Sequence, residues 1–483
     1  MHAALLVDEV IRLIFAQKDS RLSLAAARTC KAWSDPALDE IWCHVPSLAP
    51  LVCLIPGVIC IDGVYNIVPD ASIDLTTFSS YASRIKHITR RHDIRIHPAL
   101  LSILSQPGIP ILSKLVTTQL CLTDPHSIPA ALSLCPTLRQ FDLRLDKRSS
   151  ADAADYIAKL LDTCTSLERV RLGGSLDSRL NGVISRTTHL RSLTLLTGTF
   201  LAEDTLVAIS SFPCLSELDF EAGHLDAEVL SKAWTSEQGY FQALDKLHVR
   251  AQGPVIELLL KIISPSLRTL HVEATSPPGA DHEPSVCWSS IFGLIKLNAP
   301  HTETLTIEQH LEDIDLDSAG SDAQPPTNLQ SSPNQLTFEI IRLLAPLRCL
   351  RSFTIDMTRI PNLCDRDIET LATWWPCLEH LELGSLHLDE CITPPRTTLA
   401  CLASLSSMRK LQSLIIPLAI DDTIPAPCSN SCSVLSRATI TSASPPNGAL
   451  VAPYLRGVFP LLKQVEGSER HETEWAQVNA LLQ

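Results

Sequence analysis

The sequence predicts an α/β fold. In it, a short helical N-terminal module precedes an irregular solenoid with parallel strands on its concave side and helices on its convex side. Three observations predict this fold. A Leu-x-x-Leu-x-Leu pattern recurs along most of the 483 residues, and helix-like segments lie between its copies. Residues 5–45 carry helical apolar spacing and lack the repeated pattern.

The clear copies of the pattern have their first leucines at 138, 167, 190, 215, 244 and 267, so they are 23–29 residues apart. Further copies start at Leu350, Leu378 and Leu411, and weaker ones lie near 305–307, 435–440 and 462–465. A period of 20–29 residues is typical of a leucine-rich repeat. One such unit cannot cover its own apolar face, so neighbouring units stack to form a continuous core.

Within each copy, the alternation at its end predicts a short strand with one buried face. Segments 151–162, 204–210 and 255–263 are helical in character and lie between strands. The residue between the last two apolar positions should point out of the concave sheet. These positions form the candidate target-binding surface: Asp142, Arg171, Asp219, His248, His271 and Glu382.

The N-terminal residues carry helix signals. Asp8 and Glu9 suit the positive end of a helix, and apolar residues follow at helical spacing. A second helix is expected over residues 22–33, ended by Asp35-Pro36, and a third short helical piece near Trp42. Some fifty residues are too few to bury a core easily, so the module should borrow apolar surface from a neighbour or a partner.

This N-terminal stretch resembles an F-box. The family pattern has Leu-Pro-x-Glu, two aliphatic residues and Ile-Phe, then aliphatics, a Cys, a basic residue and Trp, and a closing Leu-Trp. Val7 stands where the family has Pro, and Lys18 where it often has Leu. The positions that match, besides Lys31, are the candidate adaptor-binding residues: Leu6, Glu9, Val10, Ile11, Ile14, Phe15, Leu22, Leu24, Cys30, Trp33 and Trp42.

The resemblance implies a substrate-recognition subunit of a Skp–cullin–F-box ubiquitin ligase. Its expected partners are a Skp-type adaptor, through it a cullin, and a target protein on the repeat array. The predicted division is an F-box-like module over 1–46, a linker and start of the solenoid over 47–110, and the solenoid over 111–465. An acidic, Ser/Pro/Gln-rich insertion at 309–335 interrupts the solenoid, and a charged tail covers 466–483.

Composition excludes several classes of function. With 39 basic and 53 acidic residues, the formal net charge of −14 argues against nucleic acid. The longest apolar run, 48–61, contains two prolines and is too short to cross a membrane. No secretory signal precedes the 16 cysteines, which predicts a reducing, cytoplasmic or nuclear setting. Cysteines before repeat leucines are expected to be small buried side chains: Cys135, Cys164, Cys214, Cys349 and Cys377.

No motif points to catalysis, a cofactor or a metal. Cys428 and Cys432 form an isolated pair without a partner pair, and His87, His92 and His97 lie five residues apart, on no common face. The chain is therefore predicted not to be an enzyme. One alternative is a plain interaction scaffold whose N-terminal helices cap the array without assembling a ligase. An enzymatic role would require His248 or His271 to lie beside a carboxylate in a closed pocket.

Overall fold

The computed structural model describes residues 7–16, 20–68, 73–89, 95–104, 112–122, 135–145, 150–174, 178–196, 201–234, 239–275, 286–309, 336–384, 395–421, 424–425, 434–442 and 444–482. The chain divides into two compact units, Met1–Leu215 (unit 1) and Ser216–Gln483 (unit 2), and each is described by itself. Among the described helices, none is long and apolar enough to cross a membrane.

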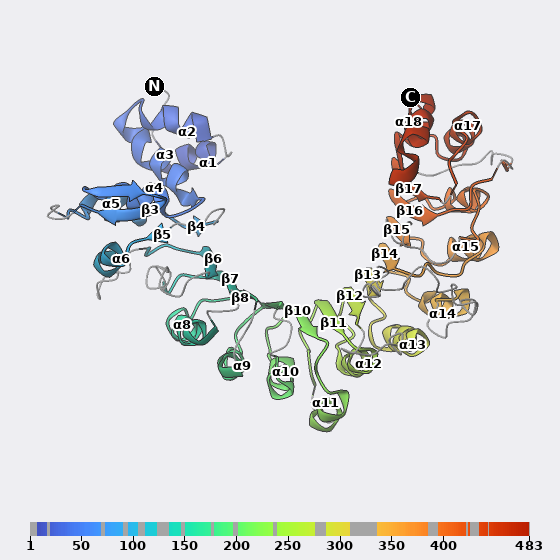
Figure 1. The fold of residues 1–483 in the computed structure, drawn as a ribbon, viewed down its shortest axis with the longest axis horizontal. Helices are drawn as coiled ribbons and strands as arrows, with labels where there is room; N and C mark the ends of the chain where they lie inside the picture. Colours follow the sequence, from blue (N-terminus) through green and yellow to red (C-terminus); the bar gives the residue numbers. More distant parts are fainter. Residues whose placement is uncertain are drawn as a thin grey trace, which may run out of the picture. The chain divides into compact units, whose positions relative to one another are not determined.

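Unit 1 begins with the N-terminal helical module, α1 (Asp8–Phe15), α2 (Ser20–Ala27) and α3 (Lys31–Cys43) (Figure 1). The expectation that Asp35-Pro36 ends the second helix is wrong. Cys30 adopts an extended backbone (φ −153°, ψ 157°), so α2 ends before it and a new helix starts at Lys31. Pro36 then lies inside α3, where its ring lacks the N–H of one helical hydrogen bond, and its side chain is buried.

The module has its own small apolar core. Ile11 and Phe15 of α1 are buried against Ala26 of α2 and Ala37 of α3, and Trp33 packs against this cluster. Positions 11 and 15 are four residues apart, so they share one side of α1. The three helices therefore bury part of their apolar surface among themselves.

After α3 the chain enters a row of parallel strands in unit 1. Each strand pairs with the next in the order β1, β4, β6, β7, β8, β9. The bounds are β1 (His44–Val45), β4 (His87–Ile88), β6 (Thr117–Leu122), β7 (Gln140–Leu145), β8 (Arg169–Gly173) and β9 (Ser192–Leu196). Strands β1 and β4 lie before the first clear sequence repeat. They could not be predicted, because a two-residue strand leaves no alternating pattern to detect.

A second, three-stranded sheet lies in the segment expected to be a linker. Strand β2 (Val58–Ile61) pairs antiparallel with β3 (Val64–Ile67), and β3 pairs with β5 (Arg95–Ile96). Asp62 and Gly63 connect the hairpin with φ of 49° and 77°. An Asp-Gly pair between apolar runs is a strong hairpin signal, which the sequence analysis missed. Helices α4 (Ala49–Val52), α5 (Thr76–Ala82) and α6 (Pro98–Leu104) flank this sheet.

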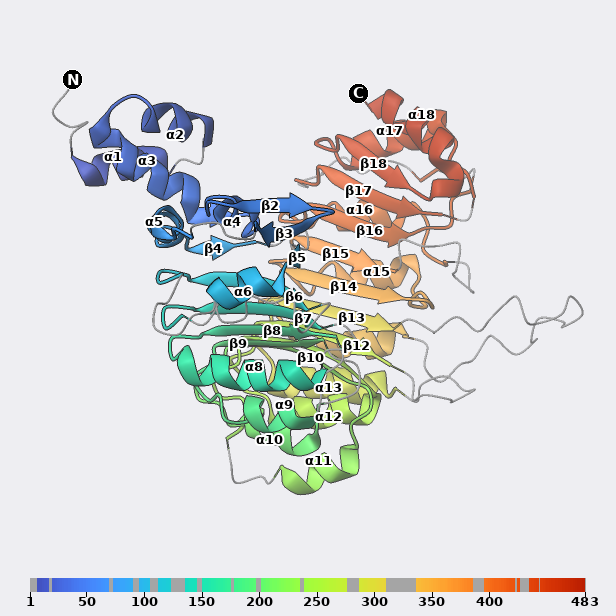
Figure 2. The same cartoon turned by 60° about the vertical axis from the view of Figure 1, so that its left-hand side comes forward.

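Unit 2 contains a continuous row of parallel strands that pair in chain order (Figure 2). Equivalent residues face each other, for example Leu218 with Leu247 and Leu247 with Leu270. The bounds are β10 (Glu217–Ala222), β11 (Lys246–Ala251), β12 (Thr269–Ala274), β13 (Thr304–Gln309), β14 (Ser352–Met357), β15 (His380–Leu383), β16 (Ser413–Pro417), β17 (Arg437–Thr441) and β18 (Gln464–Gly467). The clear and weak sequence copies in this unit thus lie at strands, as predicted.

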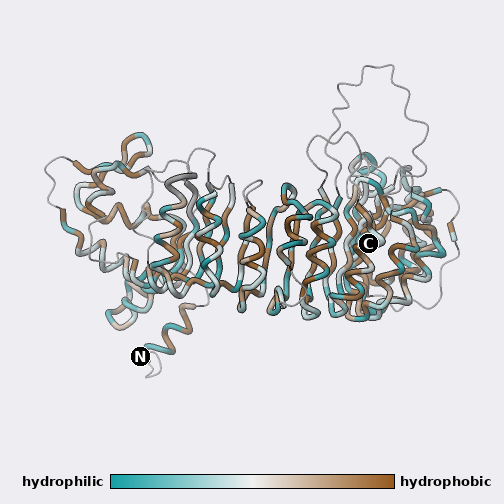
Figure 3. The backbone as a smooth tube through the Cα atoms, turned by 90° about the horizontal axis from the view of Figure 1, so that it is seen from below, coloured by the Kyte–Doolittle hydropathy of each residue, from teal (hydrophilic) through white to brown (hydrophobic). Residues whose placement is uncertain are grey.

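Helices follow most strands and cover one face of each row (Figure 1). The predicted helical segments 151–162, 204–210 and 255–263 are confirmed as α8 (Ser150–Thr163), α10 (Glu203–Ser210) and α12 (Gly253–Ile262). The others are α9 (Ser178–Ile184), α11 (Ala227–Ala233), α13 (Trp288–Asn298), α14 (Phe338–Ile341), α15 (Asp365–Leu371), α16 (Cys401–Leu405), α17 (Gly448–Val458) and α18 (Glu472–Leu482). Polar and apolar residues alternate along the successive coils (Figure 3).

The core lies between each strand row and its helices. In β10–β14 every second side chain is buried, with leucine, valine, isoleucine or phenylalanine at most inward positions. Trp288 and Trp375 are almost fully buried, and each indole N–H is satisfied: Trp288 Nε1 donates to Gln309 Oε1 (3.0 Å), and Trp375 Nε1 donates to the Leu344 carbonyl (3.2 Å). The insertion expected over 309–335 does not begin at Gln309, because Gln309 is the last residue of β13 and is buried. Residues 310–335 lie outside the described residues.

The expectation of buried cysteines holds at only two of the five positions. Cys135 and Cys164 are buried, Cys377 is half-buried, and Cys214 and Cys349 are exposed. The reason is the position of each cysteine relative to the first leucine of its repeat. The buried pair precedes its repeat leucine by three residues, whereas the other three precede it by one and lie at the turn into the strand.

The segment expected to be a charged tail ending in a helical piece over 474–482 forms a helical cap, and that piece is confirmed as part of α18. Trp475 and Val478 of α18 are buried, and α18 packs on α17 and β18. Asn479 Oδ1 accepts a hydrogen bond from Val465 N (2.8 Å), while its Nδ2 donates to Val465 O (2.7 Å). One carboxamide thus satisfies both backbone groups of a residue in the last strand of the row.

Truncating an inward side chain should destabilise the array. Leu270 on β12 is fully buried, so Leu270→Ala should lower the free energy of unfolding by about 2–5 kcal/mol through lost burial and a residual cavity. Thr269→Ala removes a half-exposed neighbour on the other face and is the matched control. Chemical denaturation followed by circular dichroism measures both, and equal losses would contradict the assigned strand faces.

Candidate protein-binding surfaces

One face of the unit 2 strand row carries polar and charged side chains. On β10–β15, residues that alternate with the buried positions are half-buried or exposed. We call this set the open strand face. Its charged and imidazole side chains are Glu217, Asp219, Glu221, Lys246, His248, Arg250, His271, Glu273, Glu308, Asp356, His380 and Glu382.

Parallel register lines these side chains up in rows across the strands. Lys246 Nζ lies 2.8 Å from Glu217 Oε1 on the neighbouring strand. Arg250 bridges two carboxylates, with Nη1 3.2 Å from Glu221 Oε1 and Nε 3.0 Å from Glu273 Oε1. These pairs are partly exposed, so each contributes little stability, but together they hold the side chains in fixed positions.

Two predicted residues meet at the centre of this face. His248 and His271 occupy paired positions on β11 and β12, and their rings stack with centroids 3.9 Å apart and 9° between the planes. His248 Nδ1 lies 2.9 Å from Asp219 Oδ1, and His271 Nε2 lies 2.9 Å from Glu308 Oε1. Burial lowers the pKa of His248, but the hydrogen bond and charge of Asp219, with Glu273 and Glu308, outweigh burial and raise it.

Carboxylates gather toward the β13–β15 part of the face. Glu382 lies opposite Thr354 on β14 and two residues from the register position of Asp356. Burial raises the pKa of Glu382, and the charges of Asp356 and Glu308 raise it further, while a hydrogen bond with Thr354 opposes them. This part of the face therefore holds negative charge against an electrostatic penalty.

Part of this surface lies beyond the positions that the repeat motif predicts. The repeat motif places the outward residue between its last two apolar positions, but the strands continue two residues further. Glu221, Arg250 and Glu273 occupy that next outward position, and Glu308 and Asp356 follow in the same row. The signal was present, because the alternation of buried and outward residues extends past the repeat motif.

The other predicted target-binding residues lie in unit 1. Asp142 on β7 and Arg171 on β8 face each other in register. Asp142 Oδ2 accepts a hydrogen bond from Gln119 Nε2 on β6 (3.2 Å), and the Arg171 side chain is exposed. The structure thus brings Asp219, His248 and His271 together on unit 2 and pairs Asp142 with Arg171 on unit 1.

The predicted adaptor-binding residues fall into two groups. Ile11 and Phe15 are buried inside the module, Trp33 packs against them, and Val10, Cys30 and Trp42 are half-buried. Glu9 and two aliphatic residues, Ile14 (37% exposed) and Leu24 (55% exposed), face outward. Leu13, which belongs to the same predicted helical stripe, is 72% exposed. Leu6 and the side chain of Leu22 lie outside the described residues.

Helical spacing explains why α1 has two apolar sides. Ile11 and Phe15 share the inward side, while Val7, Val10 and Ile14 share another at steps of three and four residues. Val7 is 45% exposed, so this second apolar stripe leaves much of its surface uncovered. Exposed aliphatic residues at such spacing are typical of a helix that has a further protein contact to make.

Ion pairs fix this module to the segment that follows it. Arg84, just after α5, pairs with Asp39 and with Asp35 Oδ1 (2.7 Å) on α3, and Arg12 of α1 pairs with Asp39 Oδ2 (2.7 Å). Burial raises the pKa of Asp39, but the hydrogen bonds from Arg12 and Arg84 outweigh burial and lower it. The ring centroids of Trp42 on α3 and Tyr81 on α5 lie 4.8 Å apart and add a further contact between the same two segments.

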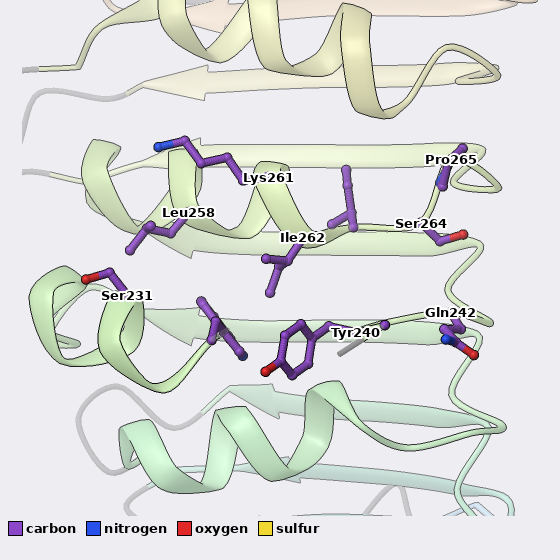
Figure 4. A pocket seen from close by; sticks show the side chains of 11 residues that line it. Ser231, Tyr240, Gln242, Leu258, Lys261, Ile262, Ser264 and Pro265 are labelled. Atoms are coloured by element: carbon purple, nitrogen blue, oxygen red, sulfur yellow. The ribbon is translucent and has the colours of Figure 1, made fainter. Parts of the chain in front are cut away.

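A pocket lies on the helical side of unit 2, lined by residues of the segments before and after strand β11. It has a volume of about 530 Å³ and is open to solvent (Figure 4). Its lining joins the end of α11 and the loop after it to α12 and the following turn, including Trp234, Tyr240, Lys261 and Pro265. Among the described residues that line it, Lys261 and Tyr240 are the titratable ones, and none is a carboxylate or a histidine.

An enzymatic role would require a histidine beside a carboxylate in a closed pocket, and this condition is met only in part. His248 and His271 each lie beside a carboxylate. Their side chains are 34% and 27% exposed on an open sheet face, whereas general acid–base catalysis relies on a site that holds a substrate and excludes water.

The repulsion between Glu382 and its neighbouring carboxylates should lower the free energy of unfolding at neutral pH. A carboxyl group whose pKa is higher in the folded than in the unfolded state destabilises the fold once pH exceeds both values. Glu382→Gln should therefore raise the free energy of unfolding at neutral pH, and the gain should vanish below about pH 4.3, where the unfolded group is also protonated. Denaturation at both pH values measures the effect. Glu369→Gln on α15 is the exposed control, and a gain at Glu382 that persists in acid would contradict the electrostatic cause.

Comparisons with known proteins leave the family open. No family model matches the sequence, and no curated protein matches it. Among solved structures, the chain is similar to the leucine-rich repeat-containing protein LegL7 from Legionella pneumophila. That match has 12% sequence identity and a TM-score of 0.34, and it covers 66% of this chain and 97% of the other.

Proposed function

We propose that this chain is a non-catalytic, protein-binding subunit that recognises the substrate of a Skp–cullin–F-box ubiquitin ligase, in the cytoplasm or nucleus. The N-terminal helical module would dock a Skp-type adaptor, and the open strand face would hold the target. The observation that carries the proposal is the presence of two surfaces on one chain. One is an exposed apolar stripe on α1, and the other is a charged strand face on β10–β15.

The adaptor surface consists of what the module leaves exposed. Because Ile11 and Phe15 are occupied in the internal core, the adaptor contact would fall on Leu13, Ile14 and Leu24. Covering a large aliphatic side chain fully contributes about 1.5–3 kcal/mol, so a few such residues supply useful affinity. Resemblance of residues 6–42 to the F-box pattern supports the identity of the partner.

The target surface favours a positively charged segment. Glu308, Asp356 and Glu382 lie on adjacent strands of the open strand face, and the raised pKa of Glu382 reflects burial and the repulsion among them. An arriving Lys or Arg side chain would relieve that repulsion and steer association. Polar faces with fixed charges suit protein or peptide partners, because charge complementarity selects among them.

A second candidate function is an interaction scaffold that assembles no ligase. The observation in its favour is the anchoring of α1 and α3 to Arg84 through Asp39 and Asp35. A module held this way resembles a terminal cap, which repeat arrays need in order to shield their last coil. The two functions differ in whether the exposed stripe on α1 has a partner.

Adaptor binding is the direct test. Co-expression of the full chain with a Skp-type adaptor, followed by affinity purification, should recover the adaptor. The double variant Leu13→Asp with Ile14→Asp should lose it, because charge replaces exposed apolar contact area without touching the core. Val229→Asp on α11, which also replaces an exposed aliphatic side chain by a charge, is the control and should retain binding. Failure of the unaltered chain, where a known F-box protein recovers the adaptor, would leave the scaffold function in its place.

The target surface has an independent test that does not need the adaptor. The full chain should bind Lys- and Arg-rich segments on a peptide array more strongly than acidic ones, and added salt should weaken this binding. Glu308→Lys with Glu382→Lys should abolish the preference. Glu369→Lys with Glu339→Lys, at exposed positions on α15 and α14, makes the same change of charge away from the strand face. An equal effect of that control would assign the preference to net charge and reject the open strand face.

A further inference from the structure

Three potential metal ligands converge where the N-terminal helical module meets the strand row of unit 1. Cys43 is the last residue of α3, His44 begins β1, and His87 begins β4. One ligand atom from each, a thiol sulfur and two imidazole nitrogens, lies within 4.8 Å of the other two. Among the described residues, this is the one group of three or more His, Cys, Asp or Glu side chains that meets this condition.

Strand register creates the convergence. His44 pairs directly with His87 across parallel strands β1 and β4, and Val45 pairs with Ile88. Backbone hydrogen bonds from Lys86 N to Cys43 O (3.0 Å) and from Thr89 N to Val45 O (3.0 Å) hold the pairing on both sides. The two imidazole rings consequently stack, with centroids 4.4 Å apart and 18° between their planes. The sequence hides this pair, because 43 residues separate the histidines.

The donor set fits zinc. Zn²⁺ binds thiolate at about 2.3 Å and imidazole at about 2.0–2.1 Å, so tetrahedral ligand atoms are about 3.3–3.6 Å apart. The stacked rings of exposed His44 and half-buried His87 would have to turn so that one nitrogen of each points at the ion at that spacing, while Cys43 is buried at the end of α3. One sulfur with two imidazoles suits zinc better than magnesium or calcium, which prefer oxygen ligands.

We propose that Cys43, His44 and His87 form a zinc site with three protein ligands and a fourth position open to solvent on the His44 side. The ion would link the end of α3 and strand β1 to strand β4. It would therefore fasten the N-terminal helical module to the first strands of the array. This inference does not depend on the adaptor or target proposed above.

The surrounding charges bear on the proton that the ion displaces. Burial raises the pKa of Cys43, the charges of Glu40 and Asp39 act in the same direction, and Lys86 opposes them. Metal binding would replace the S–H bond of Cys43 by an S–Zn bond and release one H⁺ to solvent.

Cobalt and zinc titration of the full chain tests the site. The reduced protein, freed of metal by a chelator, should take up one equivalent of Co²⁺. It should show a thiolate-to-cobalt charge-transfer band with the intense visible absorption of a tetrahedral ion, and Zn²⁺ should displace the cobalt. Cys43→Ser should remove the charge-transfer band. His44→Asn should weaken binding at least about tenfold, because losing a ligand costs no less than losing its supporting partner.

Matched controls are available in the same unit. Cys214→Ser and His189→Asn change exposed side chains away from the site and should leave the titration unaltered. His44 is exposed, so its variant tests coordination even if Cys43→Ser fails to fold. Zn²⁺ should also raise the thermal unfolding midpoint of the unaltered chain and not that of His44→Asn. Absence of the thiolate band, its survival in Cys43→Ser, or unchanged affinity in His44→Asn would each overturn the proposal.

Discussion

The structure depends on one constraint: every second side chain of a strand must find apolar neighbours that its own coil cannot provide. Leu247 on β11 is covered by Leu218 and Leu270 on the strands beside it, and this relation repeats along unit 2. Because the strands are parallel and in register, the inward residues form continuous rows, and so do the outward ones. The apolar core and the charged face are two results of the same register.

This constraint explains how a degenerate repeat produces an ordered surface. The outward rows need not conserve a pattern, because burial on the other face already sets their positions. Arg250 between Glu221 and Glu273, and the stacked pair His248 and His271, arise from alignment across strands and from no local motif. The same mechanism brings Cys43, His44 and His87 together at the start of the unit 1 row.

Periodicity made the repeat strands and the helices between them predictable, because burial enforces it. Three features escaped the sequence for physical reasons. Pro36 lies inside α3 because the extended backbone of Cys30 moved the helix start, a local choice that propensity does not reveal. The early strands β1 and β4 are too short to show alternation. The side chains that assemble the candidate sites come from different coils, so only register across strands brings them together.

The α1 residues show a related limit. Ile11 and Ile14 are equally apolar in sequence, yet one is buried in the module and the other is 37% exposed. A helical stripe identifies residues that need a neighbour, and it does not say whether that neighbour is internal or another protein. Only the packing of α2 and α3 against one side of α1 separates these roles.

At the end of the unit 2 row, Asn479 satisfies backbone hydrogen-bonding groups that apolar side chains could cover but not satisfy. Its carboxamide presents one donor and one acceptor to the backbone of Val465, as the main chain of another strand would. The row therefore ends on a side chain that imitates a next strand but cannot be extended. At this position the edge of the row has no free backbone donor or acceptor, so Val465 offers no template on which a strand of a second molecule could pair.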